Sequence, residues 1–182
     1  MTILILGLLI WVGAHVFKRV APEARAQMGD RGKGVVALSL VISIVLMVIG
    51  YKMTDGPVWW GRGPATTGVN NLLVLVGFYL FAASGAKTRI TRVIRNPQLA
   101  GFSLWAVAHL LVNGDLASII LFGGLLMWAQ AEIMILNRAN PDWTPPAPPP
   151  MKKEIVAVVA AVVLYGVVAA IHALLGYNPF GV

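Results

Sequence analysis

The sequence predicts an all-α protein, a polytopic integral membrane bundle of about six transmembrane helices with both termini on the outer side. The first observation is composition, because 58% of the 182 residues are hydrophobic, only 12% are charged, and the mean hydropathy is +0.80. A soluble domain of this size is less apolar than this. The second observation is the spacing of the apolar segments, and the third is the alternation of basic residues between successive connections. We therefore expect one membrane domain over 1–182, surrounded by lipid.

Six apolar segments are long enough, or nearly so, to cross a hydrocarbon core about 30 Å thick. The fourth segment is the shortest of them. Between the fifth and the sixth, residues 141–150 read PDWTPPAPPP, and a stretch with six prolines must form an extended, non-helical linker. The predicted spans lie near 2–21, 34–51, 69–86, 98–113, 116–136 and 154–175.

The basic residues give the orientation of the bundle. The connections after the first, third and fifth spans hold 12 of the 14 Lys and Arg residues, whereas the opposite side holds only Lys52 and Arg62. The positive-inside rule then places both termini outside. No basic residue precedes the first apolar run, and Lys18 and Arg19 follow it. This order favours a retained first span over a cleaved signal peptide.

Several function classes are excluded by residue usage. The chain has no cysteine, which rules out disulfides, thiolate metal sites and cysteine nucleophiles. The formal net charge of +7 lies in short connections and forms no basic face, so we expect no nucleic-acid partner. The sequence also contains no glycine-rich phosphate loop, Ser-His-Asp set or HExxH motif. No catalytic residue is assigned from these patterns.

All three histidines fall inside or at the end of a predicted span: His15, His109 and His172. Histidine is disfavoured in lipid, and neutral imidazole is the commonest metal ligand. With a rise of about 1.5 Å per residue, His15 lies roughly 20 Å from the outer edge of its span and His109 roughly 16 Å from the inner edge of its span. His172 lies roughly 27 Å up the last span, near the outer surface. We predict His15 and His109 as the pair that holds a shared metal or haem iron, with His172 as a third candidate; buried histidines bonded to backbone are the alternative.

A short repeat surrounds the two predicted ligands. Residues 10–17 read IWVGAHVF and residues 104–111 read LWAVAHLL, so that both contain Trp-x-x-Ala-His. Spans one and four run in opposite directions, and such a repeat matches a twofold axis in the membrane plane. Trp11 and Trp105, each one turn before a histidine, are predicted to support the ligands.

Three polar residues carry two interpretations each. Asn113 follows His109 by one turn and either supports that histidine or forms a turn with Gly114 and Asp115. Asp115 either belongs to the same support or caps the next helix at its N-terminus. Glu132, near the inner end of the fifth span, is expected to reach the surface or to meet Arg138.

The stretch 90–130, ITRVIRNPQLAGFSLWAVAHLLVNGDLASIILFGGLLMWAQ, resembles the NnrU family of bacterial membrane proteins. The pattern WA-x-AHLL-x-NGD-x-AS-x-x-LFG is specific, and the flanks agree. The resemblance implies the bacterial inner (cytoplasmic) membrane, a periplasmic location for both termini, and a link to denitrification and nitric oxide reduction. The family is similar to the 15-cis-zeta-carotene isomerase, a membrane enzyme that uses haem b. This resemblance implies that His15 and His109 occupy the positions of the histidines proposed to ligate haem in that enzyme.

Two positions depart from the patterns of these relatives. The family usually has Arg-His-Pro where this chain has Arg95-Asn96-Pro97. The carotene isomerase has a cysteine three residues before the second histidine, and this chain has Ala106. The second departure argues against a direct transfer of isomerase activity.

Three hypotheses follow for the function. The first is a protein that binds haem b between His15 and His109, with a role in redox or nitric oxide chemistry or in the support of a haem enzyme. The second is a non-catalytic subunit of a larger membrane complex, with a membrane protein partner or a second copy of the chain. The third is a haem-dependent isomerase that acts on a carotenoid or another lipophilic substrate.

Overall fold

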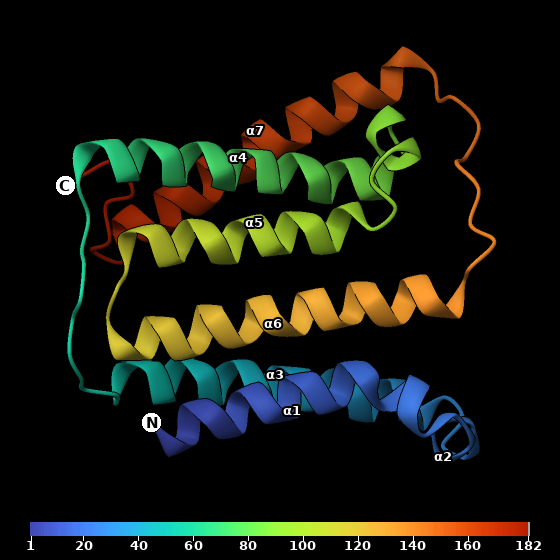
Figure 1. Ribbon diagram of the computed structural model, residues 1–182, viewed down its shortest axis with the longest axis horizontal. Coiled ribbons are helices and arrows are strands. Elements are labelled where there is room, and N and C mark those ends of the chain that lie inside the picture. Colours follow the sequence, from blue (N-terminus) through green and yellow to red (C-terminus); the bar gives the residue numbers. More distant parts are fainter. Residues whose placement is uncertain (182) are drawn as a thin grey trace.

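The computed structural model describes residues 1–181, and these fold into a bundle of long helices that run side by side (Figure 1). Five of the helices are long and apolar enough to cross a membrane, and α5 is a shorter apolar helix. The predicted helical membrane bundle is therefore confirmed. The elements are α1 (Thr2–Val20), α2 (Pro22–Gln27), α3 (Arg31–Lys52), α4 (Pro64–Ala86), η1 (Arg89–Arg92), α5 (Pro97–Val112), α6 (Leu116–Ala139) and α7 (Met151–Leu174).

Proline and turn residues set the helix boundaries. Pro22, Pro64 and Pro97 each stand in the first turn of a helix, where the missing N–H costs nothing. At its other end, α5 stops before Asn113, and Asp115 then caps α6. The six long elements match the predicted spans to within five residues at every boundary, whereas α2 and η1 are short helices in connections that were expected to be loops.

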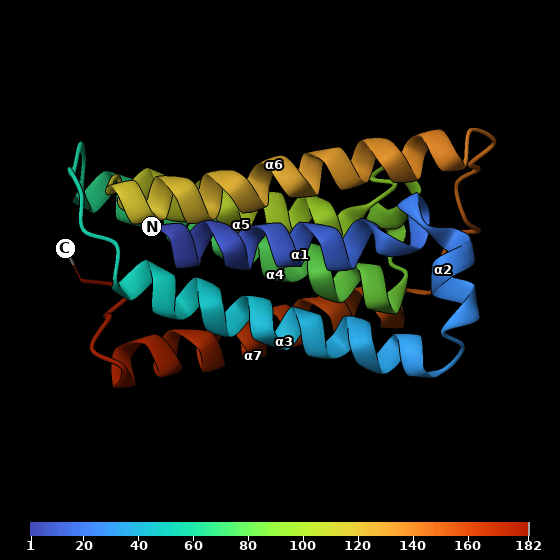
Figure 2. The same cartoon turned by 90° about the horizontal axis from the view of Figure 1, so that it is seen from below.

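The bundle consists of two packed groups joined by α6. In one group α1 packs along α3, and in the other α4 packs against both α5 and α7. α6 contacts α5 on one side and α1 on the other, and it lies between the two groups in Figure 1. Figure 2 shows α3 and α7 on one side of the bundle, away from α6.

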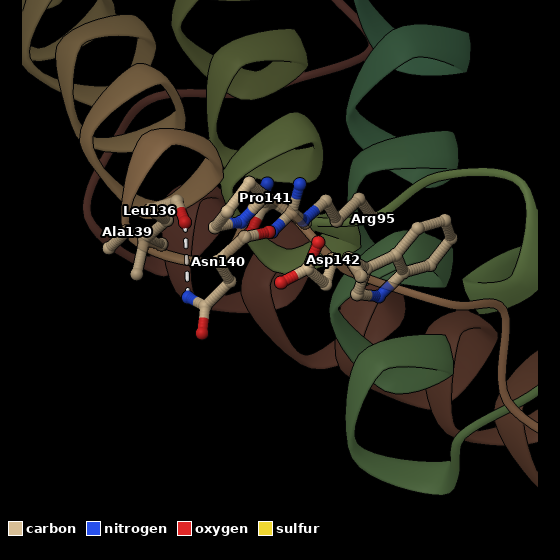
Figure 3. Close-up of a pocket in the computed structure, with 8 residues that line it drawn as sticks. Arg95, Leu136, Ala139, Asn140, Pro141 and Asp142 are labelled. Carbon is tan, nitrogen blue, oxygen red and sulfur yellow. Dashed lines mark hydrogen bonds between the residues drawn. The ribbon is translucent and has the colours of Figure 1, made fainter.

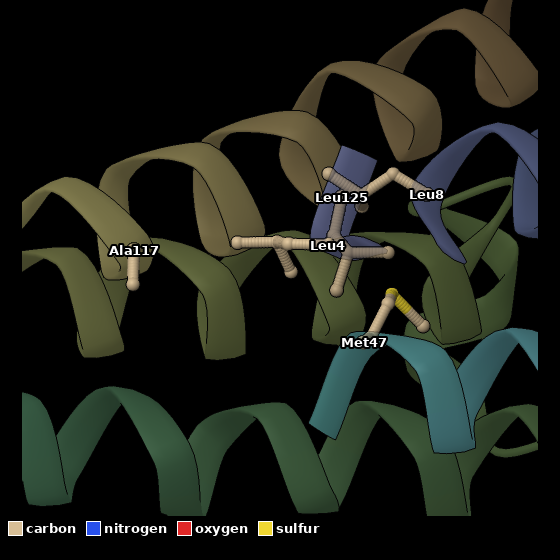
Figure 4. Close-up of a cluster of buried hydrophobic side chains, with 5 residues drawn as sticks. All are labelled: Leu4, Leu8, Met47, Ala117 and Leu125. Atoms are coloured by element: carbon tan, nitrogen blue, oxygen red, sulfur yellow. The ribbon is translucent and has the colours of Figure 1, made fainter. Parts of the chain in front are cut away.

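The first group has a compact apolar core. Leu4 and Leu8 of α1, Met47 of α3, and Ala117 and Leu125 of α6 are buried against one another (Figure 4). The close approach of α1 and α3 depends on glycine, since a Cβ at Gly50 would overlap the backbone of α1 at Leu4. These contacts fix α1 against α3 and α6.

The outer faces of the helices suit lipid rather than water. Val, Ile and Leu side chains along α3 and α7 are exposed, among them Leu38, Val45, Val159 and Val163. Exposed apolar surface on this scale marks a membrane-facing surface. The small residues of α7 are used within the chain, because Ala157 and Ala161 are buried on the helix that packs against α4.

The connections between helices divide between the two ends of the bundle as predicted (Figure 1). α1 begins and α7 ends at one end of the molecule, and the loop between α3 and α4 lies there as well (Figure 1). α2, η1 and the linker after α6 lie at the opposite end. This separation agrees with an even number of crossings. The linker contains no helix at 141–150, and Arg92 Nε donates to the carbonyl of Pro146 at 2.9 Å.

Candidate functional site

A cavity of about 560 Å³ lies between the two groups of helices. Small-molecule sites in proteins generally span ~300–1,000 Å³, so the cavity has the volume of a binding site for a sizeable ligand. Most of its wall is apolar or aromatic. Its polar residues lie toward the end of the bundle where α1 begins and α7 ends (Figure 1), which the positive-inside rule predicts to be the outer end. The lining includes Trp11, Met47, Val48, Tyr51, Lys52, Arg62, Asn70, Phe102, Trp105, His109, Phe122, Leu125, His172 and Tyr177.

Two of the three histidines meet at this cavity. His109 of α5 and His172 of α7 both line it, and both also line an adjacent cavity of about 80 Å³. Three further residues are shared by the two cavities, namely Asn70, Trp105 and Pro179. The two imidazoles therefore form part of one wall between two hollow spaces.

Both imidazoles are held in one tautomer by the backbone. His109 Nδ1 lies 2.8 Å from the carbonyl oxygen of Trp105, and His172 Nδ1 lies 2.8 Å from that of Val168. Because a carbonyl oxygen only accepts, Nδ1 must carry a proton, and in a neutral imidazole the lone pair is then on Nε2. This arrangement is how proteins commonly orient a histidine that ligates a metal through Nε2.

His15 occupies a different place. Its ring packs between the indoles of Trp11 and Trp128, with ring centroids 4.3 and 4.5 Å apart, and it lines neither cavity. Its Nδ1 lies 2.9 Å from the carbonyl oxygen of Trp11. The structure thus gives His15 the surroundings of a half-buried, backbone-bonded histidine. Trp11 connects the two regions, since it also lines the larger cavity.

His15 and His109 lie at different depths along the bundle because the helices differ in length and their inner ends are not level. α5 and α6 are joined by residues 113–115 only, so their outer ends lie together, but α5 has 16 residues and α6 has 24. At about 1.5 Å per residue, α5 begins roughly 12 Å inside the inner end of α6. His109 then lies about 5 Å from the outer end of α5, whereas His15 lies about 20 Å from the start of α1. Two imidazoles on one metal, at bonds of about 2 Å each, require much closer approach.

Aromatic side chains surround His109. The ring centroids of Trp105 and Phe122 lie 4.9 and 4.7 Å from the imidazole centroid. Phe102 continues this layer toward α1, with its centroid 5.1 Å from that of Trp105 and 6.3 Å from that of Trp11. The two tryptophans of the sequence repeat therefore lie at one aromatic layer, although their histidines do not meet.

The polar residues near His109 have separate tasks. Asn113 Nδ2 donates to the backbone carbonyl of His109 at 2.9 Å and does not touch the imidazole. Asp115 accepts from Ser118 N at 2.8 Å and from Ser118 Oγ at 2.6 Å, which confirms the N-cap interpretation. Asn113 is therefore bonded to the backbone of His109, whereas Asp115 is bonded to Ser118 at the start of α6.

Glu132 has a partner that differs from the expected one. Its carboxylate meets Arg19 at 2.6 Å rather than Arg138, and its side chain is 6% exposed. The sequence alone does not show that α1 packs against α6, and this packing is what brings Arg19 to Glu132.

Lys52 and Arg62 at the outer rim were not predicted as site residues. They are the two basic residues on the outer side of the predicted topology, and both line the larger cavity. Arg62 also donates to the carbonyls of Asn178 at 2.8 Å and Pro179 at 2.9 Å, which holds the C-terminal segment at the cavity. Their isolation among the outer connections was the signal in the sequence that could have indicated this role.

The comparison with protein families decides the family of the chain. The family model described as NnrU protein matches residues 3–179. The chain belongs to the NnrU family. No curated protein and no solved structure matches the chain.

The position at which the NnrU resemblance led us to expect histidine lies far from the cavity. Asn96 lines a separate pocket of about 440 Å³ at the inner end, together with Arg95, Asn140, Asp142 and Trp143 (Figure 3). Its Nδ2 donates to Asn137 Oδ1 at 2.8 Å, which ties α5 to α6. The replacement of histidine by asparagine in this NnrU-family chain therefore leaves the lining of the larger cavity unchanged.

Proposed function

We propose that this NnrU-family membrane protein binds haem b in the larger cavity, with His109 as an iron ligand. The observation that carries the proposal is the imidazole of His109, which has its Nδ1 bonded to Trp105 and lines a mostly apolar cavity of about 560 Å³. A neutral imidazole with a free Nε2 lone pair is the usual protein ligand of haem iron. The surrounding aromatic layer would pack against the faces of the porphyrin.

The number of available ligands favours haem over a bare metal ion. In residues 1–181 no group of three or more His, Cys, Asp or Glu side chains is placed to hold a metal. A bare zinc ion generally needs three or four protein ligands. Haem iron receives four nitrogens from the porphyrin and needs only one or two imidazoles from the protein. Paired histidines without further ligands suit haem.

The charges at the rim also fit haem b. The porphyrin is apolar over most of its area and carries two carboxylates at one edge. The cavity combines apolar walls with Lys52 and Arg62 at the outer rim. Carboxylates at this rim would gain charge-assisted hydrogen bonds. A neutral carotenoid would gain none, and the rim therefore favours an anionic ligand over the polyene of the isomerase hypothesis.

Bound haem would supply one-electron redox chemistry and a site for diatomic ligands such as nitric oxide. The chain's own residues would hold the group at His109, orient that imidazole through the carbonyl of Trp105, and exclude water with the aromatic layer. We place this protein in the bacterial inner membrane, with a role in nitric oxide metabolism or in the support of a haem enzyme.

The test is the absorption spectrum of the detergent-purified protein, oxidised and dithionite-reduced, with a pyridine haemochrome assay after haem-supplemented expression. We expect about one haem per chain and a sharp reduced α-band. H109A should lower the haem content by at least about tenfold while the size-exclusion profile stays unchanged. A colourless wild-type protein, or an H109A protein with an unchanged Soret band, would refute the proposal.

A further inference from the structure

We infer that His172 is the second protein ligand of the iron, in place of His15. This inference rests on the proposed haem binding and specifies its ligand set. His172 and His109 line the same two cavities from two different helices, whereas His15 lines neither. A group bound in the larger cavity therefore meets two imidazoles, one from α5 and one from α7.

The depths of the two histidines agree. His109 lies about 5 Å from the end of α5 and His172 about 3 Å from the end of α7, at 1.5 Å per residue. Both helices end at the same end of the bundle (Figure 1). Both ends are also close to the rim formed by Lys52 and Arg62. His109 and His172 would hold the metal of an amphipathic ligand, and Lys52 and Arg62 would attract its carboxylates.

His109 and His172 make the same backbone hydrogen bond at Nδ1, which leaves Nε2 of each ring for a ligand. Each imidazole has its Nδ1 bonded to the carbonyl four residues earlier, at 2.8 Å in both cases. The hydrogen bonds that these two imidazoles make within residues 1–181 are at Nδ1, not at Nε2. In neutral imidazoles both Nε2 lone pairs are then available for coordination. His15 is bonded at its Nδ1 in the same way, so it is the lining of the two cavities that distinguishes His172 from His15.

The C-terminal segment holds His172 in place. Tyr177 N donates to the carbonyl of His172 at 2.8 Å, which closes the last turn of α7. The carbonyl of Pro179 accepts from Asn71 Nδ2 at 3.0 Å and from Arg62 at 2.9 Å, so the segment is fastened to α4 and to the outer loop. This fastening positions the end of α7 at the cavity.

Two imidazole ligands leave no open position on the iron, so a diatomic ligand such as nitric oxide would bind only after one imidazole leaves. The oxidised wild-type protein should then show a six-coordinate, low-spin spectrum by electron paramagnetic resonance and optical absorption. H172A should convert most of the haem to a high-spin form, and added imidazole should restore the low-spin spectrum. H15A is the matched control and should leave the spin state unchanged.

The outcomes separate the two proposals. A wild-type protein without haem would refute haem binding and this inference together. Haem that stays low-spin in H172A and becomes high-spin in H15A would refute this inference alone and leave haem binding intact. Because the chain has no cysteine, a haem-independent measurement is also available in the apo protein. A short bifunctional thiol reagent should join the H109C/H172C pair and fail to join the H15C/H109C pair, and the reverse result would overturn the inference.

Discussion

Arg19 Nη1 lies 2.6 Å from Glu132 Oε1 across the interface between α1 and α6. The side chain of Glu132 is 6% exposed and that of Arg19 is 33% exposed, so the pair sits at the edge of the buried region. Arg19 also donates to the backbone carbonyl of His15 at 3.2 Å. The ion pair therefore fastens the inner half of α1, with His15 on it, to α6, which joins the two helix groups.

We expect E132A to destabilise the protein by up to about 3 kcal/mol, because it removes one partner of a largely buried pair. The charge-exchanged variant R19E/E132R should recover part of the loss. The measurement is thermal unfolding in detergent, followed by circular dichroism. K33A is the control, since Lys33 and Asp30 pair at 2.9 Å with side chains 77% and 94% exposed, and its effect should stay below about 1 kcal/mol. An E132A protein as stable as K33A would contradict this account.

A second prediction concerns the contact between α4 and α5. A Cβ at Gly101 would lie 2.6 Å from the carbonyl oxygen of Gly77, so G101A must push the two helices apart. We expect a loss of about 1–3 kcal/mol and weaker ligand retention at His109, which is carried by the same helix. Gly123, at which a Cβ would meet nothing within 4 Å, supplies the control. G123A should be neutral or slightly stabilising in the same unfolding experiment.

The predictable part of the fold follows from local signals. Hydropathy and proline locate the six long helices, because a chain in lipid must satisfy its backbone within each span. Asp115 was open to a capping role for the same local reason, since its carboxylate reaches the N–H of Ser118 three residues later. Such interactions depend only on neighbours in the sequence.

The unpredicted part depends on which helices are neighbours and how their ends are aligned. Of the three candidate histidines, His109 and His172 both line the larger cavity, whereas His15 does not. From the sequence, the depth of His109 is measured from the inner end of its span. That measure could not show that the inner end of α5 lies deeper in the bundle than the inner end of α6. The partner of Glu132 was missed because α1, rather than a later part of the same connection, lies beside α6. Helix order in space is a tertiary property that hydropathy does not encode.

The orientation of the bundle remains a prediction, and the absence of cysteine makes it testable. Single cysteines at Gly61 in the outer loop and at Lys33 at the inner end of α3 occupy exposed positions. A membrane-impermeant maleimide applied to intact spheroplasts should label G61C, whereas K33C should react only after permeabilisation. The positive-inside rule predicts this pattern, and the opposite pattern would reverse the orientation.

The last prediction concerns the outer loop where it covers the turn after α5. Trp60 Nε1 donates to the carbonyl of Leu110 at 2.7 Å, and the backbones of Trp60 and Gly114 are hydrogen-bonded at 3.1 Å. A Cβ at Gly114 would overlap the Trp60 indole, so G114A must displace either the ring or the turn.

Because Leu110 is adjacent to His109, we expect G114A to lower both the melting temperature and the haem content of the purified protein. W60F removes the indole N–H together with part of the ring that packs on Gly114, and it should cost at least about 1 kcal/mol. G61A in the same loop is the matched control, since a Cβ there meets nothing within 4 Å. If G114A retained haem as well as G61A does, the outer loop would have no part in holding His109 at the cavity.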